Sequence, residues 1–169
     1  MERIEFARMR KSQMLSAVRR LCLFIKFWLP PLLWMSLIFI GSADSASVNR
    51  SSRIIGPIVQ WLFPSMSEAG IGTCVLVIRK CAHITEYALF AILVWRALRQ
   101  HTRQDRRPWS WREPRWALAC VFAYACVDEF HQLFVPGRGP SAYDVLLDTL
   151  GGAVGLWLLW RVGKLSKRW

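Results

Sequence analysis

Apolar residues dominate four long stretches of this chain, and polar residues collect near one end of three of them. The stretches span about 21–41, 72–98, 115–135 and 143–163, and about 20 mostly apolar residues are enough to cross a hydrocarbon core. Because no water at that depth can satisfy backbone polar groups, each spanning stretch must be a helix. The pattern therefore predicts an all-α integral membrane bundle of four transmembrane helices.

Two details modify the first half of this pattern. Pro30 and Pro31 lie inside the first stretch, where they predict a kink or the inner end of the span, since proline lacks a backbone donor. Residues 54–64 are apolar but too short to cross, and Trp61 and Phe63 suit the headgroup region. We therefore expect an outer interfacial segment between the first two spans, with a loop folded back over the bundle as the alternative.

Composition agrees with a membrane protein. Hydrophobic residues make up 54% of the chain, which also has 10 Trp, and 23 basic residues stand against 11 acidic ones. A net charge of +12 would favour nucleic-acid binding on a soluble fold, but here the basic residues flank apolar runs. These features are typical of a small bacterial membrane protein, and we expect no nucleic-acid partner.

The basic residues also predict an orientation. Most of the 23 fall in the N-terminal tail, in the connection between the second and third spans, and in the C-terminal tail. By the positive-inside rule, these regions face the cytoplasm of a multi-pass protein in the bacterial cytoplasmic (inner) membrane. We therefore divide the chain into a basic tail (1–20), one transmembrane domain (21–163) and a second basic tail (164–169). The alternative, a signal peptide cleaved near 42–47, would leave three spans with mismatched flanking charges.

Ionisable residues within the spans are candidates for function, because a stray charge in lipid is costly. In the predicted topology, those of the second, third and fourth spans all lie toward the outer leaflet, where they converge on one site. Our candidates for catalysis are His83, Glu86, Asp128, Glu129 and His131. Our candidates for substrate binding are Lys80, Tyr87, Gln132, Arg138, Asp144 and Asp148.

Three motifs carry a family resemblance. Residues 79–90 (RKCAHITEYALF), 128–138 (DEFHQLFVPGR) and 144–152 (DVLLDTLGG) are similar in type and order to the VanZ-like family, over about 32–159. The resemblance implies an integral membrane protein, and some members of that family are linked to resistance to the lipoglycopeptide teicoplanin. The family commonly has Asn where this chain has Asp148, so the site here is expected to be more acidic.

Several mechanisms remain open for such a site. His83, Glu86, Glu129, His131 and the aspartates could bind a divalent metal that activates water, although we assign no metal ligand. Alternatively, His131 and a carboxylate could exchange protons while Lys80 and Arg138 hold an anionic headgroup. A binding site needs no catalysis, and polar groups can also simply lock helices together. The expected partners are a membrane lipid, a lipid-linked cell-wall precursor or a lipoglycopeptide antibiotic.

Other features have simpler interpretations. The five cysteines form no CxxC pair and predict neither a zinc site nor disulfides. Gly151 and Gly155 predict close packing of the fourth helix within the bundle. His101 is expected to be solvated. The tryptophans near the span ends are interpreted as an interfacial belt, and they are Trp28, Trp61, Trp95, Trp109, Trp111, Trp116, Trp157 and Trp160.

Overall fold

The computed structural model describes residues 2–43, 47–102, 104–136 and 139–169, without the side chains of 2–12, 43 and 47–51. These ranges form five α-helices and no strand, which confirms the all-α prediction. The helices are α1 (Glu2–Ala43), α2 (Ser47–Leu62), α3 (Glu68–Arg99), α4 (Arg112–Gln132) and α5 (Ala142–Leu165).

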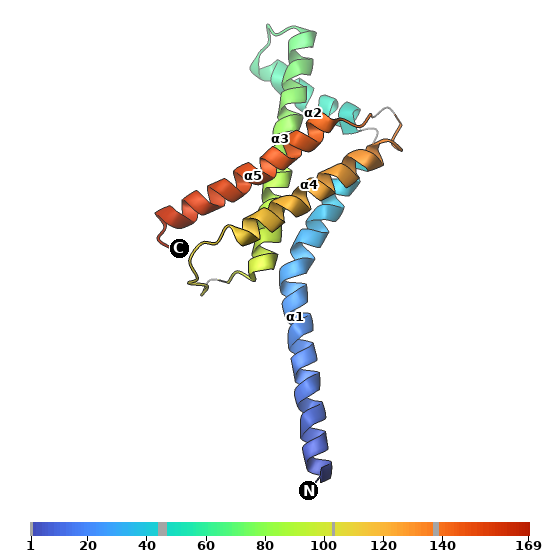
Figure 1. The fold of residues 1–169 in the computed structure, drawn as a ribbon. Coiled ribbons are helices and arrows are strands. Elements are labelled where there is room, and N and C mark those ends of the chain that lie inside the picture. The colour runs from blue at the N-terminus through green and yellow to red at the C-terminus, as the bar shows by residue number, and fades with distance from the viewer. Residues whose placement is uncertain (1, 44–46, 103, 137–138) are drawn as a thin grey trace.

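Each predicted span overlaps one helix, namely α1, α3, α4 or α5, although α1 begins 19 residues before the first span and α4 ends three residues before the end of the third. Two of the helices, over Gln13–Ser42 in α1 and Ala142–Leu165 in α5, are long and apolar enough to cross a membrane. The helix α1 continues through Pro30 and Pro31, so the prolines do not end the helix, and its axis changes direction along its length (Figure 1). The apolar segment predicted to lie at the interface belongs to α2 and the turn that follows it.

Helix α3 is the centre of the fold, and the other four helices all pack against it (Figure 1). Helix α4 runs beside α5 in the opposite direction. The core between these helices is built from apolar and aromatic side chains, with Ile38 from α1 closing one side. Its fully buried members include Tyr87, Phe90, Ala91, Ala117, Val121 and Ala125.

Two glycines of α5 allow it to touch the backbone of α3. A Cβ atom on Gly151 would lie 2.5 Å from the carbonyl oxygen of Ile84, and one on Gly155 would lie 2.6 Å from that of Ala88. The close packing predicted for this pair of glycines is therefore confirmed. Because both residue numbers rise together along the contact, α3 and α5 run in the same direction.

A buried aromatic cluster closes the C-terminal end of α3. The ring of Trp95 is 5.5 Å from that of Trp109 and 5.8 Å from that of Trp169, between centroids, and Trp95 is only 2% exposed. The prediction that Trp95 belongs to an interfacial belt is therefore wrong, whereas Trp109 is partly buried against it. The chain between α3 and α4 folds back over Trp95, and sequence periodicity does not reveal such a fold.

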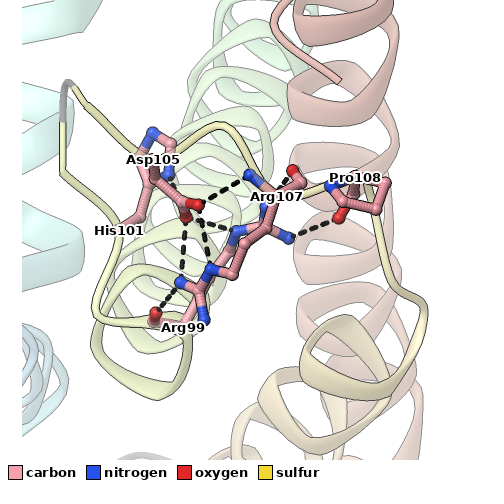
Figure 2. A network of polar contacts seen from close by, with 5 residues as sticks. All are labelled: Arg99, His101, Asp105, Arg107 and Pro108. Atoms are coloured by element: carbon pink, nitrogen blue, oxygen red, sulfur yellow. Dashed lines mark hydrogen bonds and ion pairs between the residues drawn. The ribbon is translucent and has the colours of Figure 1, made fainter.

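A network of charged side chains holds this connection in place (Figure 2). Arg99 is buried, and it donates hydrogen bonds to the Asp105 carboxylate and to the carbonyl oxygens of Arg107 and Pro108. Arg107 donates to Asp105 and to the carbonyl oxygen of Arg99. His101 lies 3.1 Å from the same carboxylate and against the ring of Trp95, so the prediction that it is merely solvated is wrong.

This network determines the charge state of Asp105. Hydrogen bonds from Arg107, and then from Arg99, hold the pKa of the Asp105 carboxyl well below its ordinary value, against the opposing effect of burial. The same partnership raises the pKa of the Arg107 guanidinium. The carboxylate therefore stabilises the folded connection wherever it is ionised.

The close contact of α5 with α3 should not tolerate a larger residue. Gly151→Ala or Gly155→Ala should lower the unfolding free energy by about 1–3 kcal/mol, because the new Cβ meets backbone atoms that cannot turn aside. Thermal melting of the purified protein in detergent measures the change. Gly72→Ala, also within a helix but with open space around its Cα, should be neutral or slightly stabilising. Equal melting temperatures for all three variants would contradict the contact.

The Asp105 network should make stability depend on pH in one direction. The pKa of Asp105 in the folded protein is below the unfolded value of about 3.9. The ionised carboxylate therefore contributes its full stabilisation above about pH 4, and this contribution is lost as the pH falls toward the folded-state pKa. Asp105→Asn should therefore lower the melting temperature at pH 7, and the gap to the unmodified protein should narrow below about pH 4. Glu68→Gln, at an exposed acidic residue, serves as the control. A gap that widens in acid would contradict the network.

Candidate functional site

Side chains from α3, α4 and α5 surround a cavity of about 190 Å³. It lies where the N-terminal half of α3 meets the end of α4 and the start of α5. Of the residues proposed from sequence, those that line it are Lys80, His83, Glu129, Gln132, Asp144 and Asp148. The cavity wall is completed by Leu76, Arg79, Gly139 and Leu147.

The end of α4 and the beginning of α5 are joined through Glu129. One carboxylate oxygen accepts a hydrogen bond from Gln132 Nε2 at 3.0 Å, and the other accepts from the backbone N–H of Ser141 at 2.8 Å. Ser141 is the N-cap of α5, and its hydroxyl accepts from the N–H of Asp144. Glu129 thus fixes where α5 begins, which in turn places Asp144 and Asp148 on the cavity wall.

Charges of both signs meet in this cavity. Lys80 of α3 forms an ion pair with Asp144 of α5, and both side chains are partly exposed. Asp148, one turn farther along α5, is 4% exposed, and no other described residue forms a hydrogen bond with its carboxyl group. A buried carboxyl group without a direct partner is costly unless it meets water, a proton or a ligand donor.

Arg79 is a wall residue that the sequence interpretation missed. Its position beside Lys80 marked it only as one of a few basic residues near the outer end of a helix. The adjacent pair Arg79 and Lys80 is a signal that could have identified it, because two neighbouring cations beside an acidic cluster are unusual within a predicted span.

The remaining candidates lie outside the cavity. Asp128 is 1% exposed and accepts a hydrogen bond from the Ser42 hydroxyl of α1. Tyr87 is fully buried about 10 Å farther along α3 than Lys80, where the core leaves no space. The ring of His131 packs against Phe39 of α1, with centroids 4.2 Å apart.

Two further candidates from the sequence, Glu86 and Arg138, are not among the described residues that line the cavity. Glu86 is 43% exposed at its side chain, and its Oε2 lies 3.8 Å from Nδ1 of His83, so it reaches the site only through that histidine. Arg138 lies outside the described residues. In the part of the chain that the structure describes, no three His, Cys, Asp or Glu side chains are placed so that they could hold a metal ion.

The polar residues therefore form two groups with different surroundings. One group lines the cavity. The other attaches α1 to the bundle, through Ser42 to Asp128, through Trp34 Nε1 to the carbonyl oxygen of Glu86 at 2.9 Å, and through the Tyr124 hydroxyl to the carbonyl oxygen of Met35 at 2.6 Å.

Comparison with known protein families shows which family this chain belongs to. The VanZ/LLP1 family model matches residues 27–163, which include the C-terminal part of α1 and every helix that contributes to the cavity. The chain belongs to the VanZ/LLP1 family. The resemblance seen in the three motifs is thereby confirmed, and this VanZ/LLP1 protein has its cavity residues within the matched region. Comparisons with curated proteins and with solved structures found no match.

Proposed function

We propose that this VanZ/LLP1 protein crosses the bacterial cytoplasmic membrane four times, through α1, α3, α4 and α5. Both termini then lie in the cytoplasm, and α2 lies at the outer interface. The distribution of basic residues supports this orientation. The directions of α3, α4 and α5 support this topology as well. Helix α4 runs opposite to α5, and α3 runs parallel to α5, as three successive spans require.

In this arrangement the polar cavity opens toward the outer leaflet and binds the headgroup of an envelope lipid or of a lipid-like antibiotic. The observation that carries the proposal is Asp148, a buried carboxyl group on the cavity wall with no hydrogen bond from the other described residues. A ligand that donates a hydrogen bond would satisfy it. Arg79 and Lys80 of α3 also line the cavity, and a phosphate would join the ion pair that Lys80 makes with Asp144.

The size of the cavity limits what enters it. A volume of 190 Å³ corresponds to roughly six water molecules, enough for a phosphate with a few hydroxyl or amino groups. Hydrocarbon chains would remain outside, against exposed apolar side chains such as Leu76 and Leu146. A lipid-linked cell-wall precursor fits this description, because it combines phosphate with sugar hydroxyls. An antibiotic such as teicoplanin, which carries sugars and an acyl chain, offers a similar combination without the phosphate.

If the site also catalyses a reaction, the described geometry favours His83 over His131 as the group that moves a proton. His83 lines the cavity, whereas His131 packs against α1. Glu129 is the nearby carboxylate on the same wall. Lys80 would then hold the anionic part of the substrate during proton transfer.

A non-catalytic scaffold is the second candidate, and the contact between Ser42 and Asp128 favours it. This contact lies outside the cavity, where a buried carboxylate joins two helices. Such contacts stabilise helix packing without any ligand. If the cavity residues act in the same way, their substitution should affect stability and not binding.

A binding experiment separates these two functions. Purified protein in detergent is titrated with an isoprenoid pyrophosphate lipid carrying the cell-wall disaccharide, and separately with teicoplanin, and complexes are counted by native mass spectrometry. Asp148→Asn and Lys80→Gln should each weaken binding of the lipid about tenfold or more, the effect of losing one charge-assisted hydrogen bond.

Asp128→Asn is the matched control, because it changes a buried aspartate outside the cavity. It should lower the melting temperature and leave the dissociation constant within about twofold. If neither probe binds, or if Asp128→Asn weakens binding as much as Asp148→Asn, the scaffold interpretation replaces the headgroup site. Release of phosphate or sugar from the bound lipid would extend the function from binding to catalysis.

A further inference from the structure

A second cavity lies at the other end of the bundle, beyond the C-terminal end of α3. It has a volume of about 920 Å³. The connection between α3 and α4 forms one side, and the residues that follow α5 form the other. The residues that line it are His101, Asp105, Arg106, Ser166, Lys167, Arg168 and Trp169.

The charge of this lining is positive. Asp105 is the acidic residue in the lining, and its carboxylate already accepts hydrogen bonds from Arg99 and Arg107 (Figure 2). In contrast, the side chains of Arg106, Lys167 and Arg168 form no ion pair or hydrogen bond within the described structure. Among the described residues, three cations therefore border the cavity without an ion pair of their own.

The side that follows α5 is held in a defined turn. Lys167 has a φ of 52°, and the N–H of Arg168 donates to the carbonyl oxygen of Gly163 at 2.9 Å, as in the reversal that ends many helices. The turn returns the Trp169 ring onto Gly163, where any Cβ would overlap the ring. Lys167 and Arg168 are thus held near Arg106 by backbone geometry.

The other side of the cavity is equally fixed. Arg99, 3% exposed, ties the connection together through Arg107 and Pro108, and its guanidinium lies 5.7 Å from the centre of the Trp169 ring. Both sides therefore rest on the same aromatic cluster. The three free cations project from a scaffold whose backbone is already ordered, which lowers the entropy cost of binding an anion.

The neighbouring residues indicate which anion is close at hand. The apolar helix α5 ends here, and Arg161 and Lys164 lie over the rings of Trp157 and Trp160 at this same end. Basic and Trp side chains at the end of an apolar helix are typical of a bilayer interface. The most abundant anions at that level are lipid phosphates.

We propose that this cavity binds the phosphate of an anionic phospholipid, with Arg106, Lys167 and Arg168 as its cationic ligands. The site is separate from the polar cavity near Asp148, since the two lie at opposite ends of α3. Its ligand neutralises the charge of the lining and joins the connection before α4 to the turn after α5.

Native mass spectrometry of the full chain in detergent tests the proposal, with phosphatidylglycerol as the probe and phosphatidylcholine as the zwitterionic reference. Each basic residue near an anionic lipid contributes about fivefold in affinity. The double variant Arg106→Gln/Arg168→Gln should therefore weaken phosphatidylglycerol binding about 20-fold and leave phosphatidylcholine unchanged. Lys167 is retained because its positive φ would complicate any substitution.

The matched control is Arg112→Gln/Arg115→Gln, which removes the same charge from exposed residues of α4 at the same end. It should change the affinity less than threefold, since neither residue lines the cavity. Equal losses in both double variants would overturn the site, because they would show attraction to general surface charge. Inorganic phosphate that binds as tightly as phosphatidylglycerol would overturn a lipid as the ligand.

This test is independent of the headgroup site in the outer leaflet. Asp148→Asn should leave phosphatidylglycerol binding unchanged, and the double variant at Arg106 and Arg168 should leave binding at the polar cavity unchanged. Melting temperatures of both double variants within a few degrees of the unmodified protein exclude misfolding as the cause. A loss of phosphatidylglycerol binding in Asp148→Asn would contradict the separation of the two sites.

Discussion

The contact between α5 and the backbone of α3 is the constraint on which the remaining structure depends. Gly151 lies against Ile84 and Gly155 against Ala88, so the two helices are fixed in height and in rotation. That register brings Asp144 to Lys80 and turns Asp148 toward the cavity. A shift of one residue would rotate α5 by about 100° and remove both carboxylates from the site.

The same rotational constraint on α4 explains why neighbouring acidic residues have different surroundings. Asp128 and Glu129 are adjacent in sequence, about 100° apart around the helix. Asp128 therefore meets Ser42 of α1, whereas Glu129 meets Ser141 at the start of α5 and lines the cavity. The first holds α1 to the bundle, and the second determines how the site is built.

Hydropathy located the central parts of α1, α3, α4 and α5, because a long apolar stretch predicts a buried or membrane-spanning helix. It did not predict that α1 begins at Glu2 or that 47–62 form the helix α2. It also brought most of the cavity residues together, since ionisable side chains in such helices collect on inward faces. The position of each side chain along its helix and the residues that it contacts could not be predicted as well from the sequence. Tyr87 shares the face of Lys80 but lies too far along α3, and His131 turns to α1 for reasons that only packing reveals. The contact between Trp95 and Trp109 forms because the connection between α3 and α4 folds back over α3, and a local sequence pattern does not predict this.

We propose that the polar cavity opens outward and that the second cavity, beside Arg106, Lys167 and Arg168, faces the cytoplasm. Labelling of cysteines in intact cells tests this orientation most directly. The five native cysteines are first replaced by Ala, and Gly139→Cys or Arg106→Cys is then introduced at the wall of one cavity or the other. A membrane-impermeant maleimide added outside should label the Gly139→Cys protein at once, and the Arg106→Cys protein only after the membrane is permeabilised. The reverse pattern would contradict the orientation and, with it, the outward-facing headgroup site.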